Sequence, residues 1–335
     1  MKKEFYLSTY NLDTHPGIDV LEYSNEDDWL QLRRKGIGGS DVGAILGLND
    51  YVSPLQVYKA KVENISQDLS NNVNIKKGND LESLIRMNYV AVEFAKQGYT
   101  VKKVQCMLIN QKYPWLRANL DGIAIKNDSE SYTDNIVIEI KYVSEWGETK
   151  WNGDDYFGIP ASYYAQVQTY MAVTGAKKAV VCALFDSSWT VKYYTIPRNE
   201  SFINDLIKKT KLFYEYHMEM KIPPAFKTGV DTEDIATAVK EEPVETYENS
   251  IMDALIGQYK DTEAQIKELT NVKNDVKNEL VNLYIKGGRP KFNPKGIKIT
   301  SYETTSFEAA KFRKDYPEMY ENYAKHSTAL KVTIK

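Results

Sequence analysis

The stretch IVIEIKYV, residues 136–143, constrains the fold more than any other part of the chain. Apolar side chains occupy nearly every position, which is the pattern of a strand that is buried on both faces of a sheet. Only Glu139 and Lys141 break the pattern, and residues two apart on a strand project from the same face. Burying two charges costs several kcal/mol each before compensation, so the pair is either a structural ion pair or part of a reactive site.

The segments around this strand predict an α/β domain. Alternating or continuous apolar runs predict further strands at 101–109, 117–125 with a bend at Asp121 and Gly122, 179–185 and 190–196. Helical spacing of apolar residues predicts helices at 79–95, 161–174 and 200–220, of which the second should end at Gly175. In the segment RRKGIGGSD, three glycines in four positions permit a tight turn before a helix at 41–46.

The chain is long enough for two units, because single cores stop growing at roughly 250–300 residues. We expect a catalytic domain at 1–225, an acidic linker at 226–250, and a long amphipathic helix with an α/β tail at 251–335. Apolar residues at 252–283 recur at three- and four-residue steps, which gives this helix coiled-coil character, and Gly287, Gly288 and Pro290 should end it. It either packs within its own domain or forms a seam with another chain.

Composition excludes several kinds of site. Two cysteines are too few for a zinc or iron–sulfur centre, and the three histidines are far apart, so any metal must be held by oxygen atoms. A net charge of −3 does not by itself indicate a nucleic-acid partner, although a chain with this net charge can still have a local basic groove. No apolar run reaches the roughly 20 residues needed to span a bilayer, so we expect a cytoplasmic protein that does not contact a membrane.

A second carboxylate changes the interpretation of the charged pair. Asp121 lies at the bend of the neighbouring predicted strand, and one lysine cannot balance both Asp121 and Glu139. Mg²⁺ prefers oxygen ligands and usually keeps several waters beside one or two carboxylates. We expect Asp121, Glu139 and the main-chain carbonyl of Ile140 to hold Mg²⁺, for which Mn²⁺ could substitute, and Glu82 to add a carboxylate from a helix.

Such a metal site suits phosphodiester hydrolysis, because the metal is a Lewis acid and lowers the pKa of bound water. Lys141 would then position the water or stabilise charge, since the carboxylates around it favour its charged form. Gln166, on the helix predicted at 161–174, either forms a hydrogen bond within the helix–sheet interface or contacts the water or the phosphate.

The ordered set of RRKGIGGSD, KGNDLES, LDGIA, IEIKY and YYAQVQTYM resembles the YqaJ viral recombinase family, relatives of phage lambda exonuclease within the PD-(D/E)xK nuclease superfamily. The resemblance covers about residues 25–200 and implies a restriction-endonuclease-like core, a mixed sheet flanked by helices, followed here by a C-terminal helical, coiled-coil-like appendage. It implies that Glu82, Asp121, Glu139, Lys141 and Gln166 are the catalytic and metal residues. Arg33 and Ser40 match the residues that hold the 5′ phosphate, although Ser40 also suits a helix N-cap. Asp41 replaces the glutamate of lambda exonuclease, a change that we expect to be mild.

The resemblance implies a 5′→3′ exonuclease of phage or prophage recombination that acts on double-stranded DNA ends in the host cytoplasm. Its 3′ single-stranded tails would pass to an annealing protein of the RecT type. A homo-oligomer is expected, with a trimer as one possibility that the appendage leaves open. An endonuclease with the same site and an inactive DNA-binding or scaffold protein remain alternatives, whereas the iron–sulfur nucleases associated with CRISPR systems need more cysteines.

Overall fold

The computed structural model describes residues 2–13, 15–65, 71–240, 250–286, 303–324 and 329. The chain forms two compact units, Met1–Ile235 and Ala236–Lys335. Within the described residues, no helix combines the length and apolarity that a membrane span requires. The first unit contains every predicted site residue.

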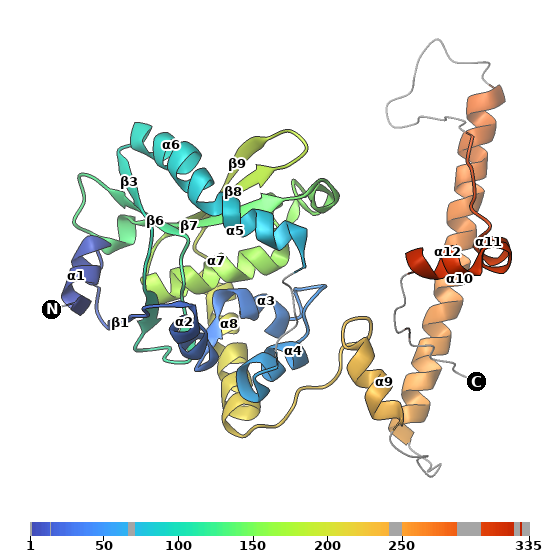
Figure 1. The fold of residues 1–335 in the computed structure, drawn as a ribbon, viewed down its shortest axis with the longest axis horizontal. Helices are drawn as coiled ribbons and strands as arrows, with labels where there is room; N and C mark the ends of the chain where they lie inside the picture. The colour runs from blue at the N-terminus through green and yellow to red at the C-terminus, as the bar shows by residue number, and fades with distance from the viewer. Residues whose placement is uncertain are drawn as a thin grey trace. The chain divides into compact units, whose positions relative to one another are not determined.

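A mixed sheet of five strands organises the first unit (Figure 1), in the order β3-β6-β7-β8-β9. Its strands are β3 (Tyr99–Lys102), β6 (Gly122–Lys126), β7 (Ile136–Val143), β8 (Lys178–Phe185) and β9 (Thr190–Pro197). Strands β7 and β8 are parallel, with Glu139 opposite Val181, and the other neighbours are antiparallel. The predicted α/β fold class, a mixed sheet flanked by helices, is confirmed.

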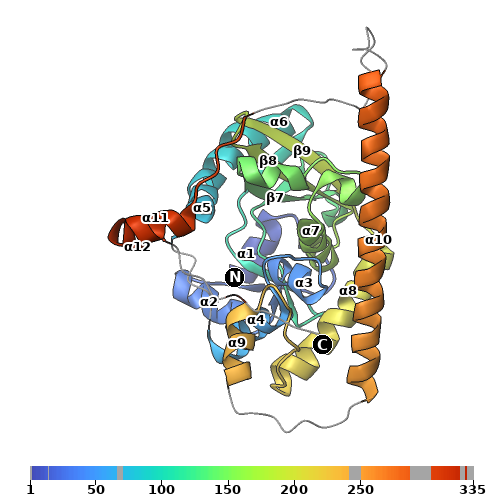
Figure 2. The same cartoon turned by 90° about the vertical axis from the view of Figure 1, so that its right-hand side faces the viewer.

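Helices cover both faces of the sheet, as Figures 1 and 2 show. One face packs against α5 (Val73–Ile85), the short turn η2 (Arg86–Val90) and α6 (Ala91–Lys96), and the other against α7 (Ala161–Thr174) and α8 (Glu200–Phe213). Along β7, Ile136, Ile138 and Ile140 lie in the core on the α5 side, and Val137 and Val143 lie in the core on the α7 side. Since side chains alternate along a strand, Glu139 and Lys141 face α7.

Helix α7 connects the two parallel strands and is buried along most of its length. It ends at Gly175, whose φ of 72° is the left-handed conformation that glycine adopts without steric cost. The predicted bounds of β7 and α7 are confirmed. Their interiors carry Glu139 and Gln166, so the same packing that forms the core brings these two polar side chains together.

The remaining elements of the first unit surround this core. They include the strands β1 (Ile18–Leu21), β2 (Ile37–Gly38), β4 (Met107–Asn110) and β5 (Leu116–Arg117), and the helices α1 (Lys2–Thr9), α2 (Glu26–Arg34), α3 (Gly39–Ile45) and α4 (Pro54–Tyr58). Short helical turns lie at η1 (Lys59–Glu63), η3 (Tyr132–Asp134), η4 (Glu145–Lys150), η5 (Asp155–Gly158) and η6 (Tyr214–Glu219). Strand β1 pairs with β4, and β2 pairs with β5.

Three predicted elements differ from the structure. The single strand predicted at 117–125 is two strands, β5 and β6, which belong to different sheets. The single strand predicted at 101–109 is two strands, β3 and β4, which belong to different sheets. The helix predicted from residue 79 begins at Val73, because Asn72 caps it by accepting hydrogen bonds from the backbone of Asn74 and Ile75. Apolar periodicity misses this first turn, because most of it is exposed.

The boundary between the units also differs from the predicted linker. Residues 226–235 belong to the first unit, and α9 (Thr232–Lys240) begins within the segment expected to be a linker. Asp231 is 2% exposed and accepts a hydrogen bond of 2.6 Å from Ser53 Oγ. A buried polar contact over this sequence distance fastens the segment to α4, which a charge pattern alone does not reveal.

The second unit contains the predicted long helix. Helix α10 runs from Ser250–Lys286, and the shorter helices α11 (Ala309–Asp315) and α12 (Pro317–Tyr323) follow. Most apolar side chains of its stripe, from Met252 to Leu283, are exposed within the described residues. The glycines and proline predicted to end the helix, and part of the predicted α/β tail, lie outside the described residues.

Candidate active site

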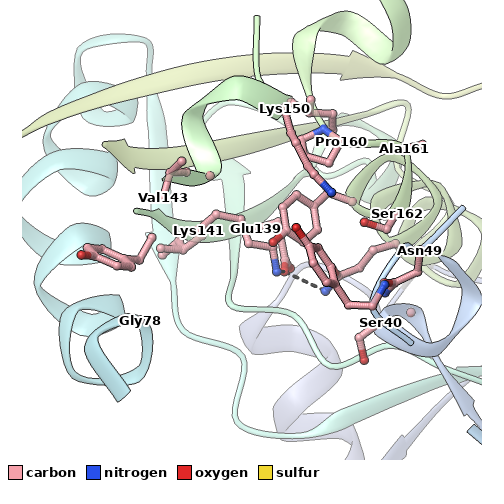
Figure 3. Close-up of a pocket in the computed structure, with 18 of the residues that line it drawn as sticks. Ser40, Asn49, Gly78, Glu139, Lys141, Val143, Lys150, Pro160, Ala161 and Ser162 are labelled. Carbon is pink, nitrogen blue, oxygen red and sulfur yellow. Dashed lines mark hydrogen bonds and ion pairs between the residues drawn. The ribbon is translucent and has the colours of Figure 1, made fainter. Parts of the chain in front are cut away.

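The first unit contains a cleft with a volume of about 1370 Å³, which brings the predicted site residues together. Arg33, Ser40, Glu82, Asp121, Glu139, Ile140, Lys141 and Gln166 all line it. Figure 3 shows Glu139 and Lys141 on β7 and Ser40 on α3 around the same pocket. Residues that span more than 130 positions of the sequence thus share one cleft.

Glu139 and Lys141 form a close ion pair at the centre of the cleft. The Lys141 ammonium donates to Glu139 Oε1 at 2.5 Å, and the Glu139 side chain is only 2% exposed. Lys141 also lies over the ring of Tyr163, with its nitrogen 4.6 Å from the ring centre. Loss of solvent would lower the pKa of Lys141, but Glu139 and Asp121 outweigh this and raise it. Lys141 is therefore a fixed cation at neutral pH.

Asp121 immediately precedes β6 and places a second carboxylate beside this pair. Its Oδ2 accepts a hydrogen bond of 2.7 Å from the backbone nitrogen of Ile140. Loss of solvent, followed by repulsion from Glu139, raises the pKa of Asp121 well above its usual range. Burial also raises the pKa of Glu139, although Lys141 opposes the shift. Two carboxylates and one ammonium leave this cluster short of positive charge.

The donor set fits a hard divalent cation. Glu139 Oε2 is buried and has no hydrogen-bond partner among the described residues, although buried polar atoms are nearly always paired. A cation held by oxygen atoms would satisfy this atom and relieve the repulsion between the two carboxylates. The oxygen atoms of Asp121 and Glu139 are donors that suit Mg²⁺, and so does the excess of carboxylates over ammonium groups in this cluster.

Glu82 lines the cleft and forms an ion pair with Arg86. Its Oε1 accepts a hydrogen bond of 2.5 Å from Arg86, one turn later, and Arg86 also donates to the main-chain oxygen of Asp121 at 3.3 Å. Across the described parts of the chain, no three His, Cys, Asp or Glu side chains gather in an arrangement that could hold a metal. Glu82 lines the cleft, and its role as a ligand stays a prediction.

Gln166 holds Glu139 from the side of α7. Its Nε2 donates to Glu139 Oε1 at 2.7 Å and to the hydroxyl of Tyr170 at 2.9 Å. Burial, followed by repulsion from Glu139 and Asp121, raises the pKa of Tyr170, so this phenol stays protonated. Of the two interpretations of Gln166, the helix–sheet hydrogen bond is present, and its acceptor is the site carboxylate itself.

Arg33 and Ser40 lie against each other at another part of the cleft. Arg33 Nη2 donates to Ser40 Oγ at 2.9 Å and to Asp41 Oδ1 at 3.4 Å. Its guanidinium carbon lies 5.2 Å from the ring centre of Trp29. Ser40 is not the N-cap of α3; Gly38 occupies that position, and its backbone nitrogen donates to Asp41 Oδ2 at 2.8 Å. Ser40 is exposed, so its hydroxyl remains accessible from the cleft.

Lys61 was not foreseen as part of this group. It extends from η1 to Asp41 Oδ2 at 2.6 Å and to the main-chain oxygen of Arg33 at 2.9 Å, and its side chain is only 4% exposed. The available signal is its position three and four residues after Tyr58 and Val57, both of which are buried. A lysine on the apolar face of a helix is unusual, and that placement indicates a partner of opposite charge.

The glycines before Ser40 serve close packing and not the tight turn expected of them. Neither Gly38 nor Gly39 has a positive φ. A Cβ on Gly39 would lie 2.4 Å from a ring carbon of Tyr170, so only glycine fits this approach. Tyr170 consequently touches the segment that carries Ser40 and, through its hydroxyl, the Gln166 amide that holds Glu139.

A mixed sheet that places Asp121, a Glu-x-Lys pair and a helical glutamine around one cleft has the layout of the PD-(D/E)xK superfamily. Residues 28–177 match the model of the YqaJ-like viral recombinase domain, so this part of the chain is similar to that domain. The predicted resemblance is confirmed.

Similar proteins include the uncharacterized protein YqaJ of Bacillus subtilis (strain 168), which is 26% identical over 341 residues that cover 96% of this chain and 99% of that protein. Among solved structures, the alkaline exonuclease LHK-Exo from Laribacter hongkongensis shares 19% identity, with a TM-score of 0.43 and coverage of 64% of this chain and all of that one. A phage-related exonuclease from Haemophilus somnus 129PT shares 15% identity, with a TM-score of 0.38 and coverage of 57% and 99%.

Proposed function

We propose that the chain is a metal-dependent exonuclease that degrades double-stranded DNA from 5′ ends and leaves 3′ single-stranded tails. The observation that carries the proposal is the unpaired, buried Glu139 Oε2 in a cleft whose central cluster has two carboxylates and one ammonium. A divalent cation bound here would satisfy this oxygen and balance the charge of the cluster. Arg33 lines the same cleft, and its guanidinium can bind a phosphate.

Asp121, Glu139 and the main-chain carbonyl of Ile140 would hold Mg²⁺ or Mn²⁺, with Glu82 as a further ligand. When bound, the metal supplies Lewis acidity and makes its bound water a better nucleophile near neutral pH. Lys141 stabilises the negative charge that develops on the phosphoryl oxygens, because its own charge is fixed by the carboxylates beside it. Gln166 keeps Glu139 in place through its 2.7 Å hydrogen bond.

The hydrolysis balances without a further reactant. The oxygen of a water molecule bonds to phosphorus, the bond from phosphorus to the 3′ oxygen breaks, and that oxygen leaves with a proton that originates from the water. The product is a nucleotide with a 5′ phosphate, and the shortened strand again begins with a 5′ phosphate. Arg33 and Ser40 would receive that phosphate, which sets the position of the next scissile bond.

The match to a viral recombinase domain supports a proposal for the biological setting. We propose that the 3′ tails are substrates for a single-strand annealing protein of the RecT type in the cytoplasm of the host cell. We assign the nuclease domain to residues 1–225 together with 226–235, which belong to the same compact unit, and treat 236–250 as its connection to the helical appendage at 251–335. Self-association, including a trimer, is part of this proposal.

The test is digestion of a linear duplex labelled at either end, beside a closed circular plasmid, with Mg²⁺ and with chelator. We expect progressive loss from the 5′ ends, an intact circle, and no cutting with chelator. Nicking or linearisation of the circle would instead indicate an endonuclease. No cutting with Mg²⁺ or Mn²⁺ would indicate a protein that binds DNA without cutting it.

A further inference from the structure

Arg33, Asp41 and Lys61 form a charged group whose three side chains differ in their exposure to solvent. Arg33 is 34% exposed, whereas the side chains of Asp41 and Lys61 are 12% and 4% exposed. Two cations and one carboxylate leave one positive charge in excess, and Arg33 is the cation that solvent and substrate can reach. Lys61 lies behind it, shielded by protein.

The carboxylate of Asp41 is shared unequally between the two cations. Its Oδ2 receives Lys61 at 2.6 Å and the Gly38 backbone nitrogen at 2.8 Å, whereas its Oδ1 receives Arg33 at the longer distance of 3.4 Å. Burial alone would raise the pKa of Asp41, but Lys61 and Arg33 outweigh it, so the group stays ionised. Lys61 is therefore the principal counter-ion of Asp41.

We propose that Lys61 is a positioning residue, which neutralises Asp41 so that the Arg33 guanidinium and the Ser40 hydroxyl remain available to the 5′-terminal phosphate. This inference rests on the proposed function and names the means by which the same cleft selects phosphorylated ends. The 2.9 Å hydrogen bond from Lys61 to the main-chain oxygen of Arg33 adds a second effect, because it fixes the backbone from which the guanidinium extends.

The expected defect follows from what Asp41 would do without Lys61. A partly buried carboxylate that has lost its main counter-ion attracts the remaining cation, and arginine pairs readily with a carboxylate through two nitrogens. Arg33 would close onto Asp41 and turn its charge away from the phosphate. The cutting centre at Glu139 and Lys141 shares no hydrogen bond or ion pair with Lys61 within the described residues, so the chemical step should change less than end recognition.

The experiment compares digestion of one linear duplex that carries either a 5′ phosphate or a 5′ hydroxyl, by the full chain with Mg²⁺. For Lys61→Met, which keeps side-chain length and removes the charge, we expect the preference for the phosphorylated end to fall at least tenfold. The loss should lie in KM for the phosphorylated end, with a smaller change in kcat and little change with the 5′ hydroxyl. Lys59→Met is the matched control: it removes a lysine of the same turn that pairs with Asp234, away from Asp41, and should keep the preference.

A double variant separates positioning from direct contact with the phosphate. In Asp41→Asn/Lys61→Met the carboxylate that would capture Arg33 is gone, while an amide oxygen can still accept from Gly38. We expect this variant to regain most of the preference, and it also provides the test if Lys61→Met alone fails to fold by thermal unfolding. A double variant that folds but has lost the preference would overturn the inference, because Lys61 would then act on the phosphate directly.

The outcomes distinguish this inference from the proposed function. If the wild-type chain does not degrade duplexes from 5′ ends, the proposed function fails, and the inference fails with it. If the wild-type chain prefers 5′-phosphorylated ends and Lys61→Met keeps that preference, only the inference fails.

Discussion

Two charged clusters contribute residues to the cleft, the second only through Arg33, and each combines a lysine and a carboxylate with a third charged residue. At β7, Lys141 pairs with Glu139 beside Asp121, which leaves one negative charge in excess. At α3, which carries Asp41, Lys61 pairs with this carboxylate beside Arg33. This second cluster therefore has one positive charge in excess. In each cluster a lysine neutralises the central carboxylate, and the sign of the third residue decides what the cluster can bind.

The comparison shows that a charged pair in a protein interior does not by itself indicate a function. A pair that is balanced and fully hydrogen-bonded can be purely structural. The β7 cluster contains a buried carboxylate oxygen without a partner, which is a place for a cation. The α3 cluster places its surplus charge on a partly exposed arginine, which is a place for an anion. Phosphodiester cleavage at a DNA end needs both.

The largest expected effect is on the rate of cutting and comes from removing Lys141 of the β7 cluster. Lys141→Ala should lower the rate of cutting at least about 100-fold, because it removes a preorganised charge next to the reacting phosphate. Binding of duplex ends should survive, since Arg33 is untouched. Rate measurements together with an end-binding assay check this, and a variant that cuts at nearly the wild-type rate would refute the assignment of the cutting centre.

The next largest effect is on end preference and comes from the α3 cluster. Arg33→Ala should reduce the preference for 5′-phosphorylated over 5′-hydroxyl ends about tenfold or more, the value of a hydrogen bond to a charged group. The rate on 5′-hydroxyl ends should change little. Competition between the two kinds of end measures the preference, and an unchanged ratio would place end recognition elsewhere in the chain.

A smaller effect is expected at the residue that holds Glu139. Gln166→Ala should lower kcat by roughly fivefold to tenfold, because it removes one hydrogen bond from a charged acceptor and leaves the carboxylate itself in place. KM for DNA ends should stay near the wild-type value. Steady-state kinetics on one labelled duplex separates the two parameters, and a change confined to KM would argue that Gln166 contacts substrate instead.

The smallest effect is on stability and depends on pH. Because the pKa of Asp121 is raised on folding, its contribution to stability in metal-free protein is complete below the unfolded value, about 4, and is lost as pH rises through the folded value. Asp121→Asn, which cannot ionise, should therefore raise Tm by a few degrees at pH 7 to 8 in the presence of chelator. The gain should vanish near pH 4, and a gain that is equal at both pH values would show that repulsion at Asp121 is not its cause.

The sequence was most informative where packing and charge conflict. Strand β7 and helix α7 were predicted with their bounds, because a nearly continuous apolar run and a helical pattern that ends at a glycine admit few other structures. Glu139, Lys141 and Gln166 stood out because polar groups in such elements need partners. One strand was predicted where the structure has β3 and β4, because the apolar pattern has no strong break where the chain passes from one sheet to the other.

Other features depend on contacts between distant segments, which a single sequence does not display. Lys61 reaches Asp41 from another helical turn, and Arg86 forms an ion pair with Glu82 in the cleft. The requirement for glycine at position 39 comes from Tyr170, 131 residues later, and not from the backbone conformation that glycine usually supplies. The hydrogen bond between Ser53 and Asp231 holds part of the predicted linker at 226–250 to the first unit.

We propose that the β7 cluster binds a cation and that the α3 cluster does not. Calorimetric titration of Mn²⁺ and Mg²⁺ into metal-free wild-type chain, Glu139→Gln and Arg33→Ala tests it most directly. We predict binding by the wild-type chain, loss of binding in Glu139→Gln, and unchanged binding in Arg33→Ala. Metal binding that survives in Glu139→Gln, or that disappears in Arg33→Ala, would contradict the account.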